Sequence, residues 1–221
     1  MKSLSDIQQN SNVSNGLTKV QPLSPSTERR IRGLIGKYPT TGKFILAFHP
    51  DKIEHFASYP DRCLFGEAPT LTDLRLAYDG RADLQWLIVQ LTTFQEKLNV
   101  SQKMTSYQLE TLAQTIATEF HHLKASEICL FLARLQGGSY TVDWYGSVSP
   151  DKIVSALREQ FMPWRNNQFY QKEKREEEQK REEALHSPNN VTWEEWLEMK
   201  KQNKENVINE DNPLNVKIEQ L

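Results

Sequence analysis

The segment from Thr105 to Trp164 constrains the fold of this chain more than any other. Thr105 and Gln108 form a capping box, so a helix is predicted to begin there. The apolar residues that follow recur at helical spacing and make one continuous face. They are Leu109, Leu112, Ala113, Ile116, Ala117 and Phe120.

A second helix is predicted after a short connection at residues 121–124. Residues 128–133 are apolar on every side, which is typical of a helix in the middle of a core. The pair Gly137-Gly138 then ends this helix, because glycine suits the backbone of a helix C-terminus.

Residues 139–149 carry three aromatic side chains, Tyr140, Trp144 and Tyr145, with Gly146 behind them. Two short β-arms, as a hairpin-like turn, and an aromatic plug in a loop both fit this segment. The rings either stack on nucleic-acid bases or anchor a partner, or they close the end of the core.

A third helix is predicted from Pro150, because Ser149 is a favourable N-cap and proline is favourable at the first helical position. Pro163 falls within the helical pattern, so we expect a kink or break there. Further along the pattern becomes highly charged, with pairs such as Glu176 and Lys180 at favourable spacing. No apolar heptad repeat accompanies these charges, so a solvated helix or spacer is expected.

A fourth amphipathic helix is predicted between Arg81 and Leu98, and with the central segment it predicts an all-α core. We therefore expect a small irregular helical bundle. The 221 residues suffice for one sizeable domain with tails. The expected organisation is a disordered tail over residues 1–24, a helical core over 25–165, a charged helix over 166–187, and a short docking helix with an acidic tail over 188–221.

The first part of the chain, up to Lys43, holds five more cations than anions. Ser26 or Thr27 is expected to cap a short basic helix that Gly36 ends. The candidate contacts with nucleic acid or an acidic partner are Arg29, Arg30, Arg32, Lys37 and Lys43. The alternative is a solvated helix that only packs on the core.

A second candidate surface lies near the C-terminus. Thr192 and Glu195 form another capping box and predict a short helix. Its apolar residues are Trp193, Trp196, Leu197 and Met199. Because they stand in a polar tail, this helix is expected either to dock on its own core or to insert into a groove of a protein partner.

Two patterns with ligand-binding precedents are incomplete. The segment GKYPTTGK, residues 36–43, has one residue too many between its glycines for a phosphate-binding loop, and Phe44 stands where Ser or Thr would hold magnesium. His49 and His55 do not share a helix face, so no metal site is expected with Asp51. The tripeptide His49-Pro50-Asp51 also occurs in J-domain co-chaperones, but the helices that flank it there are not evident.

No catalytic residue, cofactor or metal is predicted. His121 and His122 beside Glu119 lack the spacing of a catalytic pair, so an enzyme is the least favoured alternative. Cys63 and Cys129 have no zinc-ligand spacing, and two cysteines fit a reducing compartment. Neither an apolar signal core nor a run of ~18 apolar residues is present, so we expect a cytoplasmic protein with no membrane contact.

The two central helices followed by aromatic arms match the order of a winged helix-turn-helix, which would imply DNA binding. Between Thr105 and Arg165, however, anions outnumber cations by one, whereas a duplex-binding surface should be basic. The second helix is also too apolar to face a groove. A winged-helix-like DNA-binding regulator is therefore an alternative and not the favoured function.

The segment FHHLKASEICLFLARLQGGSYTVDWYGSVSPDKIVSALREQF, Phe120 to Phe161, contains an apolar helix, a glycine-aromatic turn and a following helix. With it, the portion from about Ala57 to Gln168 resembles a bacterial family that has no established activity and is common on prophages and other mobile elements. The resemblance implies no catalytic residue. Its genomic setting implies an accessory role in replication, partition or transfer of DNA.

The favoured function is accordingly a non-enzymatic interaction or adaptor module, accessory to the DNA of a mobile element. A protein partner is expected, and nucleic acid is a second candidate.

Overall fold

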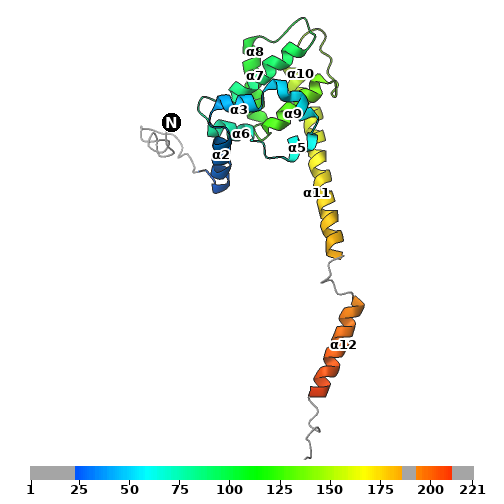
Figure 1. Ribbon diagram of the computed structural model, residues 1–221. Helices are drawn as coiled ribbons and strands as arrows, with labels where there is room; N and C mark the ends of the chain where they lie inside the picture. The colour runs from blue at the N-terminus through cyan, green and yellow to red at the C-terminus, as the bar shows by residue number, and fades with distance from the viewer. Residues whose placement is uncertain (1–22, 186–192, 211–221) are drawn as a thin grey trace, which may run out of the picture. The chain divides into compact units, whose positions relative to one another are not determined.

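The computed structural model describes residues 23–185 and 193–210, and all of its regular elements there are helices (Figure 1). Over these ranges the β-structure is limited to two isolated bridges, Thr70 with Lys124 and Gln102 with Ser147. The all-α prediction is confirmed. The chain divides into two compact units, residues 1–162 and 163–221, which are described separately. None of the described helices has the length and apolar character needed to cross a membrane.

The first part of the chain forms a series of short helices. They are α2 (Pro25–Lys37), α3 (Thr41–Ala47), the 3₁₀ turn η1 (Pro50–Lys52), α4 (Ile53–Ala57), α5 (Pro60–Phe65) and α6 (Leu71–Ala77). The predicted cap of α2 at Ser26 or Thr27 is wrong. The Ser24 hydroxyl accepts the Thr27 N–H at 3.2 Å, and Pro25 takes the first helical position. The predicted end at Gly36 is also one residue early.

Helix α3 explains why residues 36–43 do not form a phosphate-binding loop. The hydroxyl of Thr40 accepts the Lys43 N–H at 3.2 Å and caps the helix, so Gly42 and Lys43 lie in its first turn. Phe44 follows with its side chain fully buried. The apolar residues 44–47 are therefore helical.

Three longer helices form the core of the first unit. They are α7 (Ala82–Lys97), α8 (Ser106–Glu119) and α9 (Ala125–Gln136). The predicted capping box of Thr105 and Gln108 is present, and the predicted apolar face of α8 is buried. Helix α9 is buried over most of its length, and the chain leaves it at Gly138, whose φ is +73°.

The apolar residues of α7 are not equally buried. Leu84 and Ile88 are only half-buried, whereas Trp86 is completely buried. Asp83 and Gln90 are also fully buried, although their polarity alone suggests exposure. Polar groups in a core need partners, so the face of α7 follows hydrogen bonding as well as hydropathy.

Residues 139–149 form a loop, and the predicted hairpin-like turn does not exist. The Gln102 N–H donates to the carbonyl of Gly146 at 3.0 Å, and the Val148 N–H donates to the carbonyl of Gln102 at 3.0 Å. The loop thus bridges to the connection before α8, and its internal backbone hydrogen bond, from the Ser147 N–H to the carbonyl of Trp144 at 2.8 Å, closes a turn. Of the two sequence interpretations, the loop is the correct one.

The last elements are α10 (Pro150–Ser155), the π-helical turn η2 (Ala156–Phe161), α11 (Met162–Leu185) and α12 (Trp193–Glu210). The predicted kink or break at Pro163 is replaced by this π turn, in which the Met162 N–H donates to the carbonyl of Leu157. Pro163 is the second residue of α11, where a missing N–H is tolerated.

The second unit is described through α11 and α12. Helix α11 has no buried residue, as predicted for a solvated helix. Helix α12 begins at Trp193 as expected but reaches Glu210, so it is longer than the short helix predicted, and residues 203–210 belong to it. The predicted tails at residues 1–22 and 211–221, and Thr192 of the capping box, lie outside the described residues.

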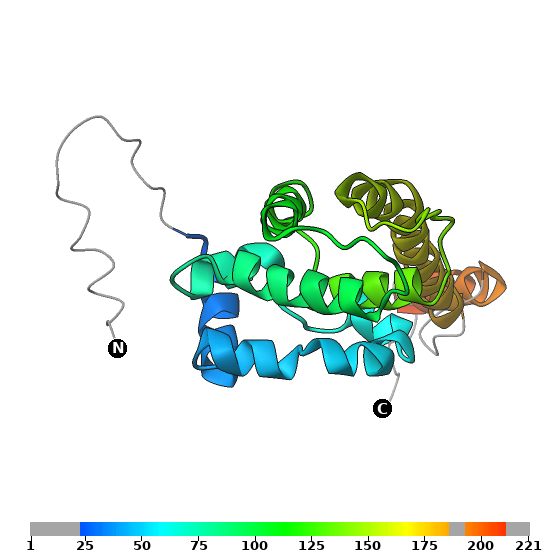
Figure 2. The same ribbon diagram turned by 90° about the horizontal axis from the view of Figure 1, so that it is seen from above.

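Within the first unit, α9 is the central element. It contacts α4 and α5 on one side and α7 and η2 on the other. Figure 2 shows α3, α4 and α5, in blue to cyan, along one side of the unit, and α8 and α10, in green to olive, along the opposite side. Two layers of helices therefore enclose α9, which accounts for its apolar sequence.

Replacement of Trp86 by alanine should lower the free energy of unfolding by about 3–5 kcal/mol, because a fully buried indole leaves a cavity. Trp193, at 68% exposure, provides a matched control, and its replacement by alanine should leave stability unchanged. Urea unfolding followed by circular dichroism at 222 nm measures both. An equal effect of the two substitutions would contradict the assignment of the core.

Candidate functional site

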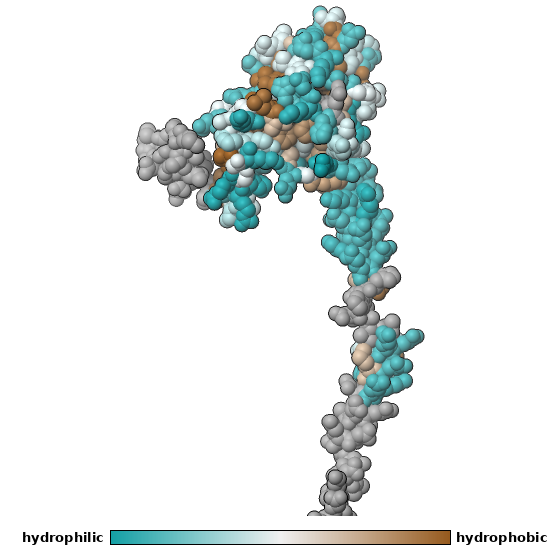
Figure 3. All heavy atoms as spheres, in the orientation of Figure 1, coloured by the Kyte–Doolittle hydropathy of each residue, from teal (hydrophilic) through white to brown (hydrophobic). Residues whose placement is uncertain are grey.

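Helix α2 presents a basic surface, which is drawn mostly in the hydrophilic colour in Figure 3. The helix contacts α6, and Leu34 is its buried residue. Arg30 takes part in this contact, because its guanidinium donates to the nearly buried carboxylate of Asp73 of α6 at 3.2 Å. The predicted contact residues on α2 therefore do not have equal roles.

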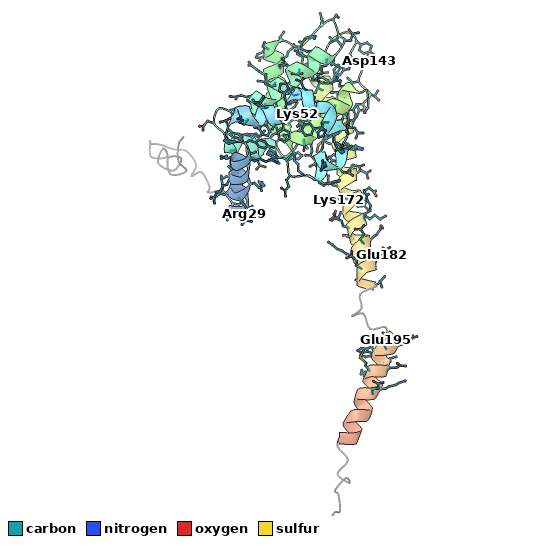
Figure 4. The ribbon with its side chains drawn as sticks, viewed as in Figure 1. Arg29, Lys52, Asp143, Lys172, Glu182 and Glu195 are labelled. Atoms are coloured by element: carbon teal, nitrogen blue, oxygen red, sulfur yellow. The ribbon has the colours of Figure 1, made fainter. Side chains whose placement is uncertain are left out.

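Arg29, Arg32 and Lys37 are exposed on α2, and Lys43 is exposed on α3 (Figure 4 labels Arg29). Within the described part of the chain, neither Arg29 nor Arg32 forms an ion pair. A Cβ at Gly33 would meet nothing within 4 Å, so the backbone beside these arginines is open to a ligand. We call Arg29, Arg32 and Lys37 the α2 cations; all three side chains are exposed and can bind an anion.

One end of α2 borders a cavity of about 210 Å³, which we call the aromatic pocket. Four aromatic side chains line its walls. Tyr38 is the C-cap residue of α2 and Phe48 is that of α3. Phe56 lies in α4, and Tyr59 is the N-cap residue of α5. The rings of Phe48 and Phe56 are stacked with centroids 5.6 Å apart and planes 9° apart. Tyr38 meets Phe48 edge-on at 6.1 Å. The walls are thus a continuous aromatic surface.

Charged groups stand at the same pocket. The Lys37 ammonium lies 5.5 Å from the ring centroid of Tyr38, and the Arg62 guanidinium lies 5.6 Å from that of Tyr59. Glu67 contributes the opposite charge. Among the described lining side chains, with the histidine counted as neutral, positive charges exceed negative ones by one. It is therefore suited to a ring system that bears or adjoins an anion.

The deepest lining residues are Cys63 and Ser126, both buried. The Ser126 hydroxyl donates to the carbonyl of Cys63 at 2.8 Å, and the Cys63 thiol donates to the carbonyl of Phe56 at 3.2 Å. Burial, and then the negative charge of Glu127, raise the pKa of Cys63 to about 11. This thiol is not activated as a nucleophile.

The sequence does not predict the aromatic pocket, although Lys37 beside it is among the predicted contacts. Tyr38, Phe48, Phe56 and Tyr59 come from a stretch whose turns and short helices show no long period. The available signal was the density of aromatic residues between Tyr38 and Tyr59 in a region with few aliphatic ones. That density predicts a cluster of aromatic side chains, but it does not predict that the cluster encloses a cavity.

The three aromatic residues of the loop do not form one surface. Tyr140 is buried and stacks on Phe131 with centroids 5.8 Å apart, and Trp144 is half-buried with its ring 6.2 Å from Phe94. Tyr145 is 84% exposed and has a φ of +43°. Tyr140 and Trp144 therefore close the core, as one interpretation expected, and Tyr145 is separate from them.

The histidines have structural contacts. The ring Nδ1 of His121 lies 3.2 Å from the hydroxyl of Thr72, and its ring meets that of His122 edge-on at 5.6 Å. His49 lies 3.2 Å from the carboxylate of Asp51. Among the described residues, no three His, Cys, Asp or Glu side chains are grouped so that they could hold a metal ion.

In the second unit, α12 carries the other predicted contact residues. Trp193 and Trp196 are exposed and stacked on each other, with centroids 4.9 Å apart and planes 18° apart. The Lys200 ammonium lies 4.6 Å from the ring of Trp196. Leu197 is exposed on the same helix. The result is an exposed apolar face with a cation at its edge.

Residues 103–207 match the model of a family of unknown function, DUF6633. The match covers the aromatic loop, α11 and most of α12, and it confirms a resemblance to a family without an established activity. No curated protein matches the chain. No solved structure matches it either.

Both thiols should react slowly with Ellman's reagent at pH 8 in the native state. Because burial raises the pKa of Cys63 to about 11 and raises that of Cys129 further, neither forms much thiolate at that pH. A free cysteine, with a pKa of about 8.5, has more than about two-hundredfold more thiolate at this pH. Absorbance at 412 nm in the native state and in urea measures the rates, and fast labelling of the native chain would contradict this burial.

Proposed function

We propose that the chain is a non-enzymatic adaptor that binds nucleic-acid phosphates through α2 and a protein partner through α12. The observation that carries this proposal is the presence of two exposed surfaces of different chemistry, one in each compact unit. An adaptor needs two such surfaces, because it has two partners to connect.

The α2 cations support the nucleic-acid half of the proposal. Arg29 and Arg32 are exposed and have no carboxylate partner among the described residues, whereas Arg30 is held by Asp73. Arginine donors bind phosphate oxygens with good geometry, and neutralised phosphates release counterions. The overall formal charge of the chain is −2, so attraction to nucleic acid has to come from a local surface such as this one.

The apolar face of α12 supports the protein half. Trp193, Trp196 and Leu197, with Lys200 one turn further, have the spacing of a helix that inserts into a partner's groove. Exposed tryptophans are frequent among the residues that carry binding energy at interfaces. This face has the composition of an interface and not of a solvated helix.

Two alternatives receive less support. A winged helix would use α9 for recognition, but α9 is buried over most of its length, and residues 139–149 form no wing. An enzyme would need a nucleophile with a base, or paired acids, in a cavity, and the thiol in the aromatic pocket is held protonated. The adaptor is therefore the better proposal.

The resemblance of Phe120–Phe161 to proteins of prophages and other mobile elements suggests which nucleic acid is involved. We infer an accessory role in the replication, partition or transfer of such an element, in the cytoplasm. The basic α2 would hold the protein near the element's DNA, and α12 would recruit a protein of the same process.

The full chain should bind fluorescein-labelled DNA with an affinity that falls as salt increases, and the variant Arg29→Ala/Arg32→Ala should bind more weakly. Removal of two phosphate contacts should reduce the slope of log affinity against log salt by about 1.4 to 1.8. Fluorescence anisotropy from 50 to 300 mM salt measures this slope.

Lys180→Ala/Arg181→Ala makes the matched control, because it removes the same charge from exposed positions of α11. This control should bind DNA like the native chain. If both double variants lose affinity equally, binding depends on net charge alone and α2 is not the site. If the native chain does not bind at 50 mM salt, the nucleic-acid half of the proposal is wrong.

A photo-crosslinking amino acid in place of Met199 should give a defined protein adduct in cells of the source organism. The adduct should disappear when Trp193 and Trp196 are both changed to alanine, because the apolar anchors are lost. Tyr170→Ala, an exposed aromatic on α11, is the control and should retain it. An identical pattern for all three chains would exclude α12 as the interface.

A further inference from the structure

We propose that the aromatic pocket takes one unpaired base of a single-stranded nucleic acid, while the α2 cations bind the adjoining phosphates. This inference rests on the proposed function at α2 and names its substrate class. The connection between the two features is Lys37, the last residue of α2, which also lines the aromatic pocket.

The size of the pocket suits one ring system. Its volume of about 210 Å³ is below the ~300–1,000 Å³ of cavities that hold a whole small-molecule ligand. A base therefore fits inside, and its sugar and phosphate stay at the opening. A free nucleotide cofactor, enclosed with its phosphates, would need a larger cavity.

The walls provide surfaces on which a base can stack. Tyr59 is 49% exposed, and its ring lies 5.3 Å from that of His55. Tyr38 is fixed from outside the pocket, because the Tyr78 hydroxyl donates to the carbonyl of Tyr38 at 2.6 Å. One wall is thus held in place and the other, Tyr59, is accessible. Stacking of this kind is the main contact of proteins with single strands.

The charges stand where phosphates would be. Lys37 and Arg62 are both exposed, so their charged groups lie toward the opening of the aromatic pocket and not at its base. From Arg29 to Lys37 α2 rises about 12 Å, which is the length of three to four phosphates at roughly 3.4 Å per residue of a stacked strand. A strand that follows α2 therefore reaches the pocket with its next base.

The deepest part of the pocket explains why recognition would be independent of base type. The donors of Ser126 and Cys63 are already used for the carbonyls of Cys63 and Phe56. Besides Lys37 and Arg62, whose charged groups lie toward the opening, the described lining holds one carboxylate, that of Glu67, which can accept from an exocyclic amine. With so few free groups, the site stacks on a base and does not read its hydrogen-bonding edge.

A paired base cannot enter without being flipped out of the duplex, which costs a few kcal/mol. The proposal therefore expects tighter binding to single-stranded DNA than to a duplex of the same sequence. Phosphate contacts at α2 alone would favour the duplex, because its two strands give it the higher charge density. A preference for the single strand therefore has to come from the base.

The test uses the full chain, Tyr59→Ala, and anisotropy with a labelled 12-residue DNA strand, its duplex, and the same strand with abasic sites. Tyr59→Ala should weaken binding to the intact strand about tenfold. It should leave binding to the duplex and to the abasic strand unchanged, because neither offers a base to the pocket. Tyr107→Ala, an exposed tyrosine of α8 outside the pocket, is the control and should bind like the native chain.

Each outcome has a defined meaning. Unchanged binding of Tyr59→Ala to the intact strand overturns the pocket proposal. Weaker binding of this variant to all three DNAs also overturns it, because the loss is then independent of bases. In both cases the α2 proposal stands if Arg29→Ala/Arg32→Ala still lowers affinity. If the native chain binds none of the three DNAs, the nucleic-acid half of the proposed function fails.

Discussion

The structure depends on side chains that donate hydrogen bonds to the backbone carbonyls at the ends of short helices. A helix of five to seven residues leaves nearly all of its terminal N–H and carbonyl groups without an intrahelical partner. The carbonyl of Phe48, the C-cap of α3, is buried and accepts from Trp86 Nε1 at 3.1 Å and from the Gln90 amide. A buried carbonyl without these donors would cost about 1–3 kcal/mol. The long helix α7 thus makes the short α3 stable.

The start of α9 likewise supplies hydrogen bonds to the carbonyls at the end of α5. The Lys124 ammonium donates to the carbonyls of Leu64 and Gly66, each at 2.8 Å, and Ser126 donates to Cys63. A Cβ at Gly66 would stand 2.4 Å from a backbone oxygen, so only glycine allows the chain to turn here. Because α5 carries Arg62 and Cys63, these bonds also fix one side of the aromatic pocket. Stability and the candidate site share the same contacts.

This dependence explains which features could be predicted. Helices α8 and α9 were visible because Thr105 and Gln108 mark a start, Gly138 marks an end, and burial follows a single apolar period. Such signals are local in sequence. The same reasoning placed α7 correctly but missed Gln90, because its partner at Phe48 lies 42 residues away. A buried amide has no local signature.

The candidate site was only partly predictable for the same reason. The local excess of positive charge predicted the arginines of α2 as contact residues, and the pair of Trp193 and Trp196 predicted α12 as a contact helix. Both signals can be read from the local composition of the sequence. Which cations stay free was not visible. Arg30 is removed from the set by Asp73, 43 residues away, and the aromatic walls of the pocket come from four short segments brought together by tertiary contacts.

The charged helix α11 gives the proposed adaptor a physical property that a flexible linker lacks. Its pairs Lys172–Glu176 and Lys174–Glu178, with N–O distances of 3.5 and 3.9 Å, stabilise a helix that buries nothing. Each is worth only about 0.2–0.5 kcal/mol, but several together favour helix over coil. As a helix, its 24 residues span about 36 Å.

A semi-rigid spacer narrows the range of distances between two ligands and so raises the effective concentration of the second one at the right span. Charge pairing along α11, and not burial, would then set how strongly the two binding events are coupled.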